Sequence, residues 1–108
     1  MRVVNLTPNA IKVVHPHDPD RVNEYPPSGT ICRVGLRSEQ VGEIEGMPVF
    51  ETQVGDVQNL PEQMDDVVYI VSRMVLECLE DDRDDLVAPG DAIRDHAGRV
   101  IGCRGFSL

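Results

Sequence analysis

The apolar residues of this chain come in short runs rich in valine and isoleucine, and this pattern restricts its fold more than any other feature. The clearest run is VVYIV at 67–71, which is short, wholly apolar and made of residues that favour strands. Two further runs, 2–6 and 10–14, flank the sequence TPN and predict two strands around a tight turn. Because a wholly apolar strand is typical of one covered on both faces, we expect 67–71 to be central in a sheet.

The segment 30–36 (TICRVGL) alternates in the manner of a strand with one buried face. We expect Cys32, Val34 and Leu36 to form its apolar face. The preceding segment, 15–29, contains four prolines, and proline fixes φ and lacks an amide hydrogen, so we predict a loop there. Its sequence YPPSG has one glycine and no lysine, which indicates a corner before a strand and argues against a phosphate-binding P-loop.

The rest of the chain predicts more short strands and one helix. Residues 40–45 and 48–54 read as strands joined by a glycine-containing turn. Residues 86–93 read as a strand interrupted by Pro-Gly, and 93–106 as a closing hairpin whose turn is DHAG. Between these parts lies a predicted helix, 72–82.

The predicted helix 72–82 begins at Ser72, whose hydroxyl can cap the first turn. We expect its apolar stripe to consist of Met74, Val75, Cys78 and Leu79. Acidic residues at 80–85 oppose the helix dipole, so we expect a solvated, frayed end. The fold predicted for 1–108 is therefore a single β-rich α+β domain, a small bent antiparallel or mixed sheet or barrel with one short helix.

The chain is strongly acidic. It has 19 Asp and Glu against 10 Lys and Arg, a formal charge of −9, and its only lysine is Lys12. An acidic surface with almost no lysine fits a protein that works in concentrated salt, although a GC-rich genome also favours arginine over lysine. The charge argues against duplex nucleic acid and anionic membranes as partners, because binding these requires a basic surface.

The cysteine pattern and the N-terminal sequence bear on location. Three widely spaced cysteines, with no signal peptide expected from the first residues, argue against a disulfide framework. No stretch approaches the length of an apolar membrane span. We expect a protein located inside a cell.

Most arrangements that carry chemistry are weak in this sequence, and we predict no catalytic residues, metal site or cofactor. The sequence HPHD at 15–18 supplies two histidines, whereas a metal site needs three or four converging ligands. A Cys103–His96 pair across the closing hairpin lacks an identifiable third group to orient it. An enzyme is therefore the reading that the sequence favours least.

The arginines give a sharper alternative. Several lie on or beside predicted strands, and one opens the predicted helix. Arginine binds phosphate or carboxylate bidentately, so two or three of them could converge on one small anion or nucleotide-like ligand. The candidate residues for this site are Arg33, Ser72, Arg73, Arg94 and Arg104. The competing expectation is that these arginines pair with the abundant carboxylates.

Five segments, in this order, carry a resemblance to a known family. They are NLTP, YPPSGT, VYIVS, RDDLVAPG and IRDHAGRVIGCRGF. This chain resembles a family of small uncharacterised proteins of tailed bacteriophages, archaeal viruses and proviruses. The resemblance covers most of the chain, least well 37–62, and Asn9 stands where the family pattern has histidine, which puts any role of that histidine in doubt. It implies a viral context, with the host cytoplasm as the expected location and the virion as the alternative. It implies no particular activity.

The sequence therefore indicates two alternative functions. The favoured one is a non-enzymatic accessory or protein-interaction domain of a halophilic virus or provirus, acting on a protein partner or on a second copy of itself. The alternative is a binder of a small nucleotide-like anion, able to sequester a host defence signal. The first predicts an exposed apolar patch or sheet edge, and the second predicts arginines around one concave pocket.

Overall fold

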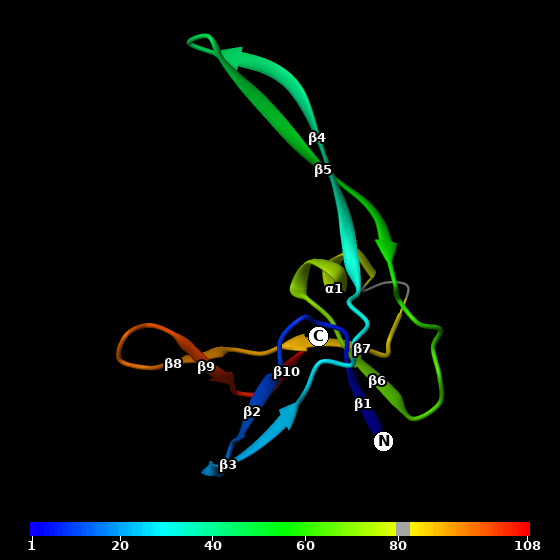
Figure 1. Ribbon diagram of the computed structural model, residues 1–108, viewed down its shortest axis with the longest axis vertical. Coiled ribbons are helices and arrows are strands. Elements are labelled where there is room, and N and C mark those ends of the chain that lie inside the picture. The colour runs from blue at the N-terminus through cyan, green and yellow to red at the C-terminus, as the bar shows by residue number, and fades with distance from the viewer. Residues whose placement is uncertain (80–82) are drawn as a thin grey trace.

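The computed structural model describes residues 1–79 and 83–108. In these residues the chain forms ten strands and one short helix, arranged in three separate sheets. Figure 1 shows a body made of two of the sheets and a long hairpin, the third, that projects away from it. The predicted β-rich α+β class is confirmed, and the sheets are open, so the alternative of a closed barrel is wrong.

The first sheet carries the core. Its members, in sheet order, are β1 (Arg2–Asn5), β6 (Val67–Ile70), β7 (Leu86–Pro89) and β10 (Phe106–Ser107). β6 is parallel to both β1 and β7, whereas β10 runs antiparallel to β7. Tyr69, Ile70 and Val71 are all buried, and β6 has a neighbour on each side, which confirms a central strand at 67–71.

The helix α1 (Arg73–Leu79) follows β6 and covers the core. The hydroxyl of Ser72 accepts a hydrogen bond from the amide of Val75 at 3.3 Å, so the predicted cap is confirmed. The predicted stripe is partly wrong: Val75 and Leu76 are buried, whereas Met74 and Cys78 are exposed. The buried stripe of the helix therefore begins at Val75, one residue later than the predicted start at Met74. The predicted last turn, 80–82, lies outside the described residues.

The second sheet is made of the remaining short strands. In sheet order these are β3 (Asp18–Tyr25), β2 (Ile11–His15), β9 (Val100–Cys103) and β8 (Ala92–Arg94). The predicted loop at 15–29 is wrong in part, because β3 lies within it. β3 is an edge strand of its sheet. Proline is tolerated in edge strands because its missing amide hydrogen need not pair with a neighbouring strand, and this accounts for Pro19.

The two predicted strands at the N-terminus are confirmed as β1 and β2, but they lie in different sheets. The side chain of Asn5 organises the turn between them. Its amide donates to the carbonyls of Asn9 and Tyr25 at 2.8 and 2.9 Å, and its oxygen accepts from the amide and hydroxyl of Thr7. Asn5 is 2% exposed, so the first residue of NLTP holds the corner between the two sheets.

The closing hairpin is confirmed. β8 pairs antiparallel with β9, and the turn between them includes Gly98, which has a φ of 81°. The carboxylate of Asp95 accepts hydrogen bonds from the amides of Ala97 and Arg99, and this fixes the turn. Gly90 and Asp91 separate β7 from β8, whereas Pro89 is the last residue of β7. The predicted interruption of 86–93 is therefore confirmed at Gly90 but not at Pro89.

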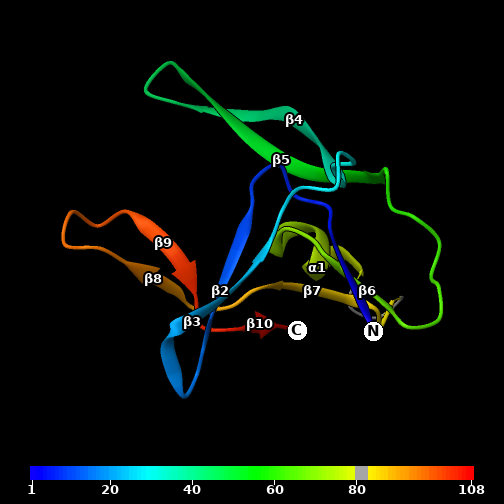
Figure 2. The ribbon, with the colours of Figure 1, turned by 60° about the horizontal axis from the view of Figure 1, so that its bottom comes forward.

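The third sheet is a single long hairpin made of β4 (Arg33–Ile44) and β5 (Met47–Gln58). Glu45 and Gly46 form its turn with φ angles of 52° and 80°, the combination of a type I′ turn. The predicted strands at 40–45 and 48–54 are confirmed but are only the outer part of it. In Figures 1 and 2 the outer half of the hairpin stands clear of every other labelled element.

The face expected for Cys32, Val34 and Leu36 is only partly buried. Cys32 is in the core, Val34 packs against it, and Leu36 is 57% exposed. Because the hairpin leaves the body between Val34 and Leu36, the alternation continues into solvent.

Candidate functional site

The hairpin β4–β5 has two chemically different faces. Residues paired across the strands share a face, and the pairs Leu36–Val54, Ser38–Thr52 and Gln40–Phe50 follow one another on one of them. Val41 is the extra residue of a β-bulge beside the last pair. We call these residues the apolar hairpin face: Leu36, Ser38, Gln40, Val41, Phe50, Thr52 and Val54. None of them carries a charge, and the four apolar side chains are each 54–58% exposed.

Next to the apolar hairpin face, the opposite face of the same strands is polar, although the exposed pair Ile44–Met47 at the tip of the hairpin also lies on it. Over the same length it presents the pairs Arg37–Gln53 and Glu39–Glu51. The chain as a whole has a charge of −9 and the opposite face carries charged residues, so the lack of charge distinguishes the apolar hairpin face from its surroundings. Large apolar side chains gathered in one exposed patch typically mark an interaction surface.

The apolar hairpin face continues the hydrophobic core. At the base of the hairpin Val34 pairs with Val57, and both pack against the core cluster. Along β4, Val34 and Leu36 lie two residues apart and on the same side. The apolar surface therefore continues from the interior of the body onto the projecting hairpin, and no charged residue interrupts it on this face.

The sequence contained a signal for this face that the prediction did not use. Phe50, Thr52 and Val54 alternate with Glu51 and Gln53, the pattern of a strand covered on one side only. Predicting strands at 40–45 and 48–54 did not show that the pairing extends to Arg33 and Gln58. The exposed face becomes visible only when the full pairing is known.

Two of the five predicted anion-binding residues come together. Arg73, at the start of α1, and Arg104, after β9, line the same pocket of about 540 Å³. Arg73 is already engaged, since it donates to the hydroxyl of Ser107 at 2.6 Å and to the carbonyl of Leu108 at 3.4 Å. Asp91 also lines the pocket and opposes an anion there.

The other three predicted residues lie elsewhere. Arg33 is at the base of the hairpin, and Arg94 donates to the carbonyl of Gly98 at 2.7 Å; neither lines the pocket of Arg73 and Arg104. The hydroxyl of Ser72 caps α1. The structure therefore brings two arginines together rather than the whole predicted set.

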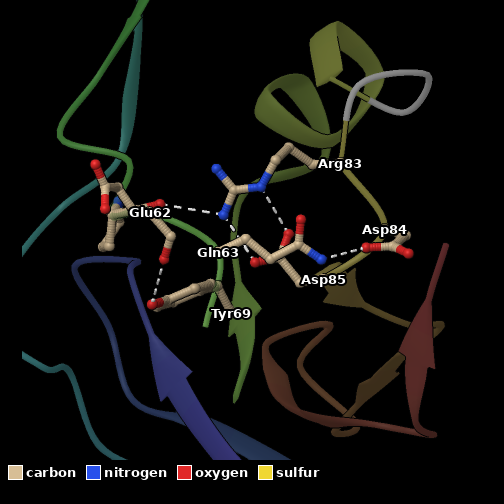
Figure 3. Close-up of polar contacts among 7 residues, drawn as sticks. Glu62, Gln63, Tyr69, Arg83, Asp84 and Asp85 are labelled. Carbon is tan, nitrogen blue, oxygen red and sulfur yellow. Dashed lines mark hydrogen bonds and ion pairs between the residues drawn. The ribbon is translucent and has the colours of Figure 1, made fainter. Parts of the chain in front are cut away.

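The expectation of a solvated acidic end at 80–85 is wrong for Asp85, which is 6% exposed and forms an ion pair that the sequence analysis missed. Arg83 binds the carboxylate of Asp85 through two hydrogen bonds, of 2.8 and 2.7 Å, and also donates to the carbonyl of Pro61 at 3.1 Å (Figure 3). The hydrogen bond to Asp85 is the main reason that the pKa of Arg83 is raised. Nearby, Tyr69 donates to the carbonyl of Glu62 at 3.2 Å. These contacts fasten the segment before β6 to the segment before β7.

The charge of Arg83 also acts on the thiol of Cys32. Burial raises the pKa of Cys32, and the positive charge of Arg83 offsets this only in part. A thiol whose pKa is raised is a poor nucleophile at neutral pH. Cys103 is also buried, and its thiol lies 3.5 Å from the carbonyl of Lys12. Both side chains behave as small apolar residues of the interior.

The described residues contain neither a cluster of metal ligands nor a helix long enough to cross a membrane. Within residues 1–79 and 83–108, no group of three or more His, Cys, Asp or Glu side chains is placed to hold a metal ion. His15, from the HPHD sequence, contacts the side-chain oxygen of Asn23 instead, at 3.1 Å. The helix in the described part of the chain has seven residues, far fewer than the 20 or so needed to cross a bilayer.

Comparison with protein-family models, curated proteins and solved structures found no match to this chain.

Proposed function

We propose that this chain is a non-enzymatic interaction protein that binds another protein through the apolar hairpin face. The observation that carries the proposal is the uncharged face that leaves the core at Val34 and continues past Leu36 to Phe50. Covering four half-exposed apolar side chains removes them from water, and apolar burial is the main favourable term in protein association.

The proposal places the protein in a virus or provirus of a salt-rich host, where it acts as an accessory factor. The five sequence segments described above support the viral context, and the charge of −9 with a single lysine supports adaptation to high salt. High salt also favours association through an uncharged apolar surface, because it screens repulsion between acidic proteins.

The test is photo-crosslinking in the natural host. A photoreactive phenylalanine analogue replaces Phe50 in one variant and Met47 in the control. Met47 is also exposed and apolar and lies on the same strand, but it points to the opposite face. We expect a discrete protein adduct from position 50 and not from position 47. Equal labelling from both positions, or none from position 50, would contradict the proposal.

A second function keeps some support from the pocket shared by Arg73 and Arg104. Two guanidinium groups on one hollow suit a small anion such as a nucleotide phosphate. Native mass spectrometry of protein purified from its own host tests this directly. A stoichiometric added mass of nucleotide size that is lost in Arg104→Gln would favour the ligand binder, whereas protein without added mass would count against it.

A further inference from the structure

The β4–β5 hairpin is long and exposes apolar side chains, so we expect that another surface covers it in the working form of the protein. A two-stranded hairpin is only marginally stable in water without a third strand or a packed face. The chain exposes 7914 Å², about 1,900 Å² more than the roughly 6,000 Å² typical of a compact protein of its mass. Its radius of gyration is 17.1 Å, against about 13 Å for a compact chain of this length. The excess surface is more than the ~800 Å² that each partner buries in a standard interface.

We propose that the apolar hairpin face is covered by a second copy of this chain, packed face to face and antiparallel about a two-fold axis. This inference rests on the proposed function and names the partner. The three cross-strand pairs of the face are nearly symmetric about Ser38–Thr52. An antiparallel copy centred there places the Leu36–Val54 pair of one chain against Phe50 of the other, and the reverse contact follows by symmetry.

The centre of this arrangement has small side chains. Ser38 and Thr52 lie between an aliphatic pair on one side and Phe50 on the other. Two sheets packed face to face lie about 10 Å apart, and small residues at the crossing allow this approach while larger ones fill the flanks. The dimer would turn two single ribbons into a four-stranded sandwich with one water-free layer.

The distribution of charge determines which face a second copy can use. Each chain carries −9, so two copies repel one another except where charge is absent, and the apolar hairpin face is such a place. A basic partner would instead be drawn to carboxylates such as Glu39 and Glu51, which lie on the opposite face. The arrangement of charge therefore excludes copies from the polar face and leaves the apolar one open to them.

The first test is the mass of the full chain in solution. Sedimentation equilibrium in molar potassium chloride compares the unaltered chain with Phe50→Ser and with the opposite-face control Met47→Ser. We expect a dimer that Phe50→Ser weakens about a hundredfold or more, because each dimer loses two buried phenylalanines, and that Met47→Ser leaves unchanged. Matching far-ultraviolet circular dichroism shows that both variants fold. A monomer at every concentration, or equal weakening by both variants, would overturn the dimer.

The second test locates the axis. Ser38→Cys and the control Glu39→Cys are each made in a Cys78→Ser background, since Cys78 is the exposed thiol among the three cysteines. Oxidation by copper phenanthroline in air should join two copies by a disulfide through position 38 and not through position 39, which lies on the other face. Equal crosslinking at both positions would indicate edge-to-edge pairing and would overturn the face-to-face dimer.

The two proposals fail in different ways. If the purified chain is monomeric while the photoreactive group at position 50 captures a different protein in the host, the dimer is wrong and the interaction function stands. If position 50 captures nothing and the chain is monomeric, both are wrong.

Discussion

Gly90 and Gly105 lie backbone against backbone. The amide of Gly90 donates a hydrogen bond of 2.7 Å to the carbonyl oxygen of Gly105, and a Cβ at position 90 would lie 2.6 Å from that oxygen. Gly105 has a φ of 146°, which side chains rarely tolerate. The two glycines end the segments RDDLVAPG and GCRG, so the contact joins the end of β7 to the segment that follows β9.

The first prediction concerns this contact. Gly90→Ala should lower the free energy of unfolding by about 3 kcal/mol, because backbone atoms must move apart to admit the methyl group. The matched control is Gly42→Ala, where an added Cβ meets no atom within 4 Å. The control should change stability by less than about 1 kcal/mol. Urea unfolding of both variants measures this, and equal effects would show that the glycines are not in close contact.

The sequence was sufficient for the local elements that have a local cause. VVYIV is apolar on both sides, Ser72 has a hydroxyl to cap the helix, and Gly98 permits a positive φ in the closing turn. Each of these features depends on residues within a few positions. The prediction of central strand, capped helix and closing hairpin is accordingly confirmed.

The elements that depend on distant partners could not be read in the same way. β3 contains Pro19 and forms because β2 offers it an edge, which no local pattern reveals. Leu36 alternates correctly with Val34, but its exposure depends on where the hairpin leaves the body. Arg73 and Arg104 meet only because β10 returns beside β7.

The second prediction concerns the ion pair of Arg83 and Asp85. Their side chains are 17% and 5% exposed, and removing one partner leaves the other charge poorly solvated. Asp85→Ala should lower the free energy of unfolding by about 3 kcal/mol. Arg99→Ala breaks the exposed pair with Asp95 and should cost less than about 1 kcal/mol. If thermal unfolding shows the same small loss of stability for Asp85→Ala and Arg99→Ala, the buried pair does not stabilise the fold.

The third prediction concerns the reactivity of the thiols. Cys78 is exposed, whereas Cys32 and Cys103 are buried. A maleimide reagent at neutral pH should therefore modify one cysteine in the folded protein and all three in urea, as counted by mass spectrometry. Rapid labelling of Cys32 in the folded protein would contradict both its burial and the raised pKa of its thiol.

The raised pKa of Cys32 also predicts a dependence of stability on pH. The folded protein holds this proton more tightly than the unfolded chain, whose thiol titrates near the ordinary value of 9.0. Its contribution is complete below about pH 9 and is lost as pH rises through the folded pKa. The free energy of unfolding, measured in urea from pH 8 upward, should therefore fall less steeply with pH for Cys32→Ala than for the unaltered chain. The variant should be less stable at every pH. Equal slopes would show that the thiol contributes nothing to this dependence.

The last prediction concerns salt. Nineteen acidic against ten basic residues give a net repulsion that salt screens, so the thermal unfolding midpoint should rise as potassium chloride increases from low to molar concentration. Within the hairpin, Glu39 lies directly opposite Glu51, and like charges in that position destabilise a strand pair. Glu39→Gln should therefore raise the midpoint at low salt and lose most of this advantage at high salt. The control Gln53→Glu adds a carboxylate on the same face, opposite Arg37, where it forms a favourable pair and should not increase the salt requirement. A midpoint that does not change with salt in the unaltered chain would contradict adaptation to high salt, and the excess of carboxylates would then need a different physical explanation.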